Sequence, residues 1–299
     1  MAERSLASDA GMAFGAAQWQ GIAFMLAGTA LFTCNDALGK WMVASLSVGQ
    51  ILFVRSVSAL VILAPLVWRA GPREVFVVAQ PGRHLLRALL IVAEVSCFYL
   101  AVRHLPLADV MAVYQATPLI VTVLAIPLLG ERVGWRRALA VGIGFIGVML
   151  VLQPAAGGVF STAALIALAG SLCYALMMIA TRRLRAFSAL TLIVYHTLAV
   201  GLAGLLALPW GWQPLDLQSA LLLALMGVVA TGAHMCVNQA LRLAPAATVV
   251  PYTYTSMIWA ILLGWVFFAD RPTLAMLAGA GIIVASGLFV LHRERQIKS

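Results

Sequence analysis

Ten stretches of about 20 mostly apolar residues follow one another along the chain, and this pattern constrains the fold more than any other feature of the sequence. A helix that crosses a bilayer must cover about 30 Å of hydrocarbon with every backbone amide bonded internally, which takes about 20 residues. Of the 299 residues, 63% are hydrophobic and 10% are charged, so the chain lacks the polar surface of a water-soluble domain and is predicted to be an all-α membrane protein. The predicted spans are residues 19–38, 49–68, 84–102, 107–129, 136–152, 159–180, 189–208, 218–240, 246–268 and 273–291.

The basic residues predict the orientation of these spans, because cytoplasmic loops of membrane proteins are enriched in Lys and Arg. With the N-terminus in the cytoplasm, most of the 19 Lys and Arg residues lie on that side, whereas Lys40, Arg103 and Arg271 lie on the other. We therefore expect a multi-pass protein of a bacterial inner membrane with both termini, residues 1–18 and 292–299, in the cytoplasm. The basic residues form short clusters rather than one continuous face, which argues against a nucleic acid partner.

The second half of the chain resembles the first. Residues 97–152 align without a gap on residues 236–291, which lie 139 positions further along. The matching pairs include Cys97 with Cys236, Arg103 with Arg242, Pro106 with Pro245, and Glu131 with Asp270. Because each half contains an odd number of spans, the second half must enter the membrane from the opposite side. We expect two inverted five-helix repeats, residues 19–153 and 154–291, around a central cavity, an arrangement that supports alternating access.

The five-plus-five organisation resembles the EamA branch of the drug/metabolite transporter superfamily. Two short motifs strengthen the resemblance: Gly130-Glu131-Arg132 follows the fourth span and Asp270-Arg271-Pro272 follows the ninth. Within this branch the chain is similar to bacterial exporters of amino acids, including aromatic ones. The resemblance implies a secondary transporter with a small-molecule substrate and a central cavity. In relatives the fifth and tenth spans commonly contribute to dimer contacts, so we expect a monomer or a homodimer.

Three charged groups stand out inside the predicted spans, where each charge costs at least about 2.5–3.5 kcal/mol on insertion scales. Asp36 and Arg55 lie at similar depth, so they either form an ion pair or leave Arg55 to contact a substrate carboxylate. Glu94, in the third span, either carries a proton or binds a substrate ammonium group, or it is a protonated carboxyl bonded to a neighbouring helix. All three are candidates for an ion pair or for charge coupling.

Other polar and aromatic side chains are candidates for lining the cavity. A stripe with the spacing i, i+3, i+4 and i+7 on the ninth span either faces the cavity or packs between helices. The stripe consists of Tyr252, Thr255, Ser256 and Trp259. His196, in the seventh span, is either a further cavity residue or a core histidine with satisfied hydrogen bonds. The predicted substrate-binding residues are Asn35, Tyr99, Tyr114, Gln115, His234, Asn238, Tyr252, Ser256 and Trp259.

Two prolines and one glycine run need a structural explanation. Pro118 and Pro251 each remove a backbone hydrogen bond from a predicted span, which makes them candidate hinges. Gly142 to Gly147 reads G-x-G-x-x-G, but the run lies inside the fifth span with no preceding strand. Close helix packing therefore explains it better than dinucleotide binding.

The sequence contains no phosphate-binding loop, no H-E-x-x-H and no G-x-S-x-G. We therefore expect no cofactor, no metal site and no catalytic residues, and we expect gradients to supply the energy. The leading hypothesis is a secondary transporter that exports small metabolites, most of all amino acids. The alternatives are transport of other metabolites or drugs, an enzyme acting on a lipid-linked substrate with Glu94 or Asp36 and His234 as acid and base, and a structural or sensory protein.

Overall fold

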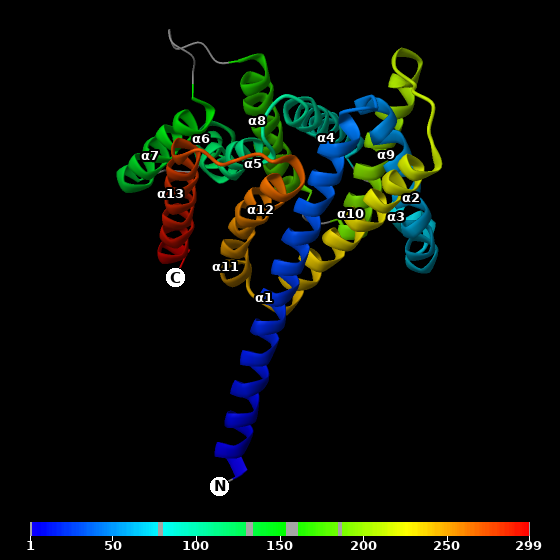
Figure 1. Ribbon diagram of the computed structural model, residues 1–299. Coiled ribbons are helices and arrows are strands. Elements are labelled where there is room, and N and C mark those ends of the chain that lie inside the picture. Colours follow the sequence, from blue (N-terminus) through cyan, green and yellow to red (C-terminus); the bar gives the residue numbers. More distant parts are fainter. Residues whose placement is uncertain (1, 77–79, 130–133, 154–160, 185–186, 299) are drawn as a thin grey trace.

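The computed structural model describes residues 2–76, 80–129, 134–153, 161–184 and 187–298, and throughout these residues the regular structure is helical (Figure 1). The helices are α1 (Ala2–Val43), α2 (Val48–Ala70), α3 (Pro72–Phe76), α4 (Pro81–Val102), α5 (Leu107–Gln115), α6 (Thr117–Leu129), α7 (Trp135–Leu152), α8 (Thr162–Arg183), α9 (Ala189–Ala207), η1 (Leu208–Trp210), α10 (Leu217–Leu243), α11 (Ala246–Val249), η2 (Val250–Thr255), α12 (Ser256–Phe268) and α13 (Leu274–Lys298). The labels η1 and η2 denote 3₁₀ helices.

Ten segments among the described residues are long and apolar enough to cross a membrane, which confirms the number of spans predicted from the sequence. Most boundaries agree within a few residues. The first span continues to Val43 instead of ending at residue 38. The motif Gly130-Glu131-Arg132 lies outside the described residues.

Short polar residues begin several helices, because the first amides of a helix have no partner inside it. The Ser47 hydroxyl accepts a hydrogen bond from the backbone N–H of Gln50 at the start of α2. Asp216 accepts one from the backbone N–H of Ser219 at the start of α10. Hydrogen bonding from Ser219 lowers the pKa of Asp216, which lies outside the spans.

The helices of the two halves alternate in space, so that most major helix pairs join one half to the other. These pairs are α1 with α10, α4 with α8, α2 with α9, and α7 with α13. In the repeat α1 is equivalent to α8, and α4 is equivalent to α10. The α1–α10 pair is therefore equivalent to the α8–α4 pair, and each of the other two pairs joins equivalent helices, as expected for a repeat. Figure 1 shows α7 and α13 side by side at one edge of the bundle, and it shows α1 beginning and α13 ending on the same side.

The glycine run in α7 is explained by helix packing. A Cβ added to Gly147 would lie 2.7 Å from the carbonyl oxygen of Gly279 in α13, so the two backbones are in direct contact. Gly144 likewise faces the side chains of Leu119 and Ser286. Gly142 has no neighbour within 4 Å, so only part of the run serves this contact.

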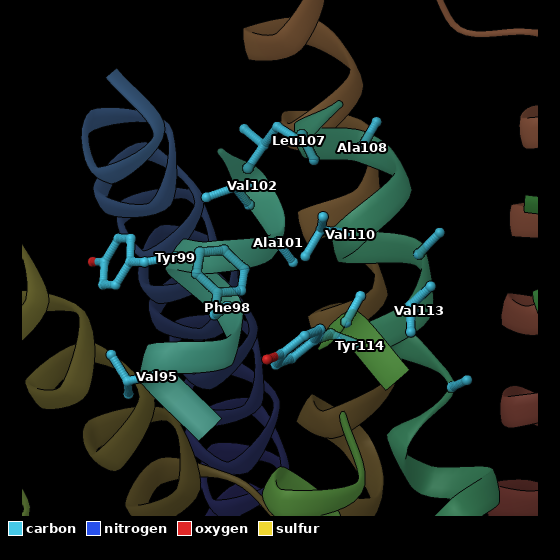
Figure 2. Packing of buried hydrophobic residues seen from close by; sticks show 14 of the residues in the cluster. Val95, Phe98, Tyr99, Ala101, Val102, Leu107, Ala108, Val110, Val113 and Tyr114 are labelled. Atoms are coloured by element: carbon cyan, nitrogen blue, oxygen red, sulfur yellow. The ribbon is translucent and has the colours of Figure 1, made fainter. Parts of the chain in front are cut away.

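Aromatic residues of α4 and α5 form the centre of the buried core. Phe98 and Tyr114 meet edge to face with ring centroids 5.4 Å apart. Figure 2 shows Tyr99 and Tyr114 on opposite sides of Phe98. This packing fixes Tyr99, which is almost fully buried, at the point where it meets α2.

Candidate functional site

The fourth and ninth spans are both interrupted within the membrane-spanning region. The fourth span breaks at Ala116, between α5 and α6. The ninth consists of α11, the 3₁₀ helix η2 and α12, and the change from 3₁₀ to α-helix occurs at Thr255. Ala116 and Thr255 are 139 positions apart and therefore equivalent in the repeat. Pro118 is the second residue of α6 and Pro251 the second residue of η2, so each candidate hinge lies close to an interruption.

The two interruptions are bonded directly to each other. The Gln115 side-chain amide donates hydrogen bonds to the backbone carbonyl of Thr253, at 3.1 Å, and to the Ser256 hydroxyl, at 2.7 Å. The Ser256 hydroxyl itself donates to the Thr253 carbonyl at 2.8 Å. Irregular backbone at membrane depth is tolerated where it is buried in protein or lines a cavity, and discontinuous helices at a repeat interface commonly form transport sites.

Arg55, in α2, is held by a tyrosine rather than by a carboxylate. Its Nη1 donates a hydrogen bond of 2.8 Å to the Tyr99 hydroxyl. Asp36 and Glu94 lie near enough to Arg55 to interact electrostatically. Across the described ranges, however, neither carboxylate forms an ion pair with Arg55 within the 4.0 Å limit. Among the described residues, Arg55 is thus a cation at membrane depth without a bonded anion.

A pocket between α2, α9 and α10 brings Arg55 and His234 together. Its cavity volume is about 30 Å³. We call it the α2–α9–α10 pocket; it is lined by Arg55, Ser56, Ala59, Ile193, His196, Thr197, Val200, Gly227, Ala230, Thr231 and His234. The rings of His196 and His234 meet edge to face with centroids 5.8 Å apart, and Phe32 lies 4.8 Å from His234.

The nine residues predicted to bind substrate do not all share one space. Gln115 and Ser256 bond to each other, and His234 lines the α2–α9–α10 pocket. Tyr252 instead packs against the cluster formed by α1 and α10, and Trp259 is 39% exposed on the surface.

The remaining predicted residues differ in their burial and hydrogen bonding. Asn35 is buried, and its side-chain oxygen has no hydrogen-bond partner in the described part of the chain. The Tyr114 hydroxyl donates to the backbone carbonyl of Glu94 at 3.3 Å. Asn238 is half-buried on α10.

Among the described residues, the groups considered for acid–base chemistry are not hydrogen-bonded to one another. His234 has no hydrogen bond to Asp36 or Glu94, all three being described residues. The searched residues contain no group of three His, Cys, Asp or Glu side chains that could hold a metal ion.

An ion pair that the sequence reasoning missed joins the two halves on the side away from the chain ends. Lys40 Nζ lies 2.6 Å from the Asp270 carboxylate and donates a second hydrogen bond, of 3.2 Å, to the carbonyl of Leu105. It also lies 4.9 Å from the ring centroid of Phe268. Two signals in the sequence pointed to this pair: Lys40 is one of the few basic residues predicted on that side, and Asp270 is the repeat partner of an acidic residue.

Comparison with known proteins identifies the family. The EamA-like transporter family matches residues 18–153 and again residues 161–292, once in each half. A riboflavin transporter of Vibrio cholerae is 29% identical to this chain, over 92% of the chain and 94% of that protein. An S-adenosylmethionine uptake transporter of Rickettsia felis is 23% identical, over 93% and 95%. A pseudopaline exporter of Pseudomonas aeruginosa is 26% identical, over 89% and 93%.

A solved crystal structure shares the fold. It is 15% identical to this chain, superposes with a TM-score of 0.63, and covers 95% of this chain and 99% of its own. Ten spans, two repeated five-helix units and a family match in each unit agree with one another: the chain belongs to the EamA-like transporter family.

Proposed function

We propose that the protein is a secondary transporter that exports small metabolites, above all amino acids, by alternating access. The observation that carries this proposal is the hydrogen bonding of Gln115 to Thr253 and Ser256, because it joins the interrupted spans of the two halves. Relative movement of the halves would change this contact and expose the space beside it to one side of the membrane and then to the other.

The charged residues support an amino acid as the substrate. An amino acid carries a carboxylate and an ammonium group, and the bundle offers a cation, Arg55, together with two carboxyl groups, Asp36 and Glu94, that lie near enough to interact with it electrostatically. Charged groups within membrane spans commonly mark a substrate pathway. The relatives are named for other substrates, and their names include both uptake and export, so the substrate and the direction rest on this chain alone.

Exchange in liposomes tests the proposal. Purified protein is reconstituted into liposomes loaded with unlabelled amino acids, and the accumulation of an external labelled amino acid is measured. We expect saturable exchange that other amino acids inhibit. Exchange of riboflavin without exchange of any amino acid would contradict the substrate class, and no flux of any metabolite in a broad panel would contradict transport itself.

Gln115→Ala tests the contact between the halves. Interhelical hydrogen bonds in membranes are worth about 0.6 kcal/mol on average, so losing two should change the balance between the transport states by about fivefold to tenfold. We expect exchange to slow by a similar factor. Gln218→Ala, at an exposed position in the first turn of α10, is the matched control and should leave exchange unchanged. Equal rates for both variants would contradict the role of Gln115.

Direction is tested in cells. Bacteria that express the protein and are fed dipeptides should release more of the freed amino acid into the medium than bacteria that express Gln115→Ala. Greater retention of the amino acid inside the cells would instead indicate uptake.

A further inference from the structure

In the described part of the chain, the two histidines of the α2–α9–α10 pocket make none of the hydrogen bonds that an imidazole inside a protein normally makes. His196 comes from α9 and His234 from α10, and both are partly buried at membrane depth. Within the described ranges neither ring nitrogen of either residue bonds to another protein group. A polar group in this position needs a partner, and no bulk water is present in the hydrocarbon region to supply one.

The pocket offers hydrogen-bond donors and lacks a carboxylate. Arg55 uses one N–H group on Tyr99, and its guanidinium has further N–H groups for a ligand. The hydroxyl hydrogens of Thr197 and Thr231 are already donated to backbone carbonyls of their own helices, at 2.9 and 2.8 Å. None of the residues lining the pocket is acidic. The group that complements this lining is therefore an oxygen anion, and a planar guanidinium fits a carboxylate best.

The backbone packing holds the pocket in place between the two halves. A Cβ on Gly227 of α10 would collide with the carbonyl oxygen of Arg55, and one on Gly201 of α9 would lie 2.9 Å from the Ser56 side chain. The first half contributes α2 and the second half contributes α9 and α10. A ligand in the pocket therefore contacts both halves at once.

We propose that the α2–α9–α10 pocket is the subsite for the carboxylate of the transported molecule, and that His196, together with His234, determines this specificity by hydrogen bonding beside the charge of Arg55. The proposal rests on the transport function proposed above and specifies its substrate class: a metabolite with a carboxylate, whose ammonium group lies toward Asp36 and Glu94. With a cavity volume of about 30 Å³ the pocket holds about two water-sized groups, which is room for the two carboxylate oxygens but not for the rest of the molecule.

The test compares two ligands that differ by the carboxylate alone, L-phenylalanine and phenethylamine. Each is used as an inhibitor of exchange and as a stabiliser of the purified protein against thermal unfolding. A hydrogen bond to a charged group changes affinity by about tenfold to a hundredfold. We expect His196→Leu to lower the affinity for phenylalanine by about this factor and to leave the affinity for phenethylamine unchanged. His104→Leu, an exposed histidine outside the spans, is the control.

Arg55→Gln is a second variant, and it removes the positive charge while keeping a polar side chain. It should abolish the preference for phenylalanine over phenethylamine. If both variants keep this preference, or if they lower the affinities for the two ligands equally, the pocket does not bind the carboxylate.

The outcomes separate this inference from the transport proposal. Exchange of an amino acid by the wild type, with an unchanged carboxylate preference in both variants, would refute the subsite and leave transport intact. Absence of amino-acid exchange, combined with stabilisation by 3-phenylpropionate that requires His196, would refute amino-acid transport and leave the subsite intact.

Discussion

The ion pair between Lys40 and Asp270 should hold the bundle closed on the side away from the chain ends. At 2.6 Å the attraction of the two charges is about 6 kcal/mol with an effective dielectric constant of about 20. Most of this attraction is offset, because both groups lose water when the pair forms. The side chains retain 13% and 22% exposure, so we expect a net contribution of about 1–3 kcal/mol, between the values typical of exposed and of buried pairs.

Asp270→Asn removes the charge with little change in size. A loss of about 1–3 kcal/mol should shift the balance between closed and open forms on this side by roughly 5-fold to 150-fold. Val102, which lines a neighbouring pocket with Lys40 and is buried, is replaced by cysteine in a background without the four native cysteines. A membrane-impermeant maleimide should then label residue 102 faster in Asp270→Asn than in the parent protein.

Two further variants decide whether the ion pair causes the change. Asp216→Asn makes the same substitution at an exposed helix cap and should leave the labelling rate unchanged. The exchange of charges in Lys40→Asp with Asp270→Lys should return the rate toward that of the parent. The reasoning is refuted if Asp270→Asn labels at the parental rate or if the charge exchange labels as fast as the single variant.

Two other predictions concern stability and are checked by thermal unfolding of the detergent-solubilised protein. Gly147→Ala should lower the free energy of unfolding by about 1–3 kcal/mol, because the added methyl group meets the backbone of α13. Gly142→Ala faces open space and, because Ala favours the helix over Gly, should be neutral or slightly stabilising. Equal melting temperatures for the two variants would contradict the packing. Tyr99→Phe removes the hydrogen bond to Arg55 and should lower the free energy of unfolding by about 1.5–3 kcal/mol. Tyr254→Phe removes a buried hydroxyl with no partner among the described residues, so it should be neutral or stabilising. Equal losses in the two tyrosine variants would show that the Arg55 hydrogen bond contributes nothing.

The spans and the repeat can be predicted from the sequence because neither prediction depends on how distant helices pack together. Lipid requires about 20 apolar residues per helix, and this requirement leaves a clear pattern in the chain. The equivalence of Glu131 with Asp270 can likewise be read directly from the alignment. The partnership of Lys40 with Asp270 cannot be, because it depends on how distant helices pack together.

The stripe on the ninth span shows a second limit of prediction from the sequence. Its spacing places Tyr252 and Ser256 on one face only if the segment is a regular α-helix, in which residues four apart differ by about 40° around the axis. The segment from Val250 to Thr255 is a 3₁₀ helix, in which four residues differ by about 120°. The structure accordingly separates the two side chains: Ser256 meets Gln115, and Tyr252 packs against α1 and α10. The sequence signals the irregularity through Pro251 but not its geometry.

The alternation of helices between the halves also determines how the protein assembles during synthesis. α1, α2 and α4 leave the ribosome before α10, α9 and α8, which are their main partners. The early helices therefore remain in the lipid without their main partners, and the packing of the bundle is complete only when the last spans have been inserted. A nascent chain that stops after α7 has inserted five helices into the bilayer without the neighbours that complete their packing, so membrane quality control should remove it rapidly.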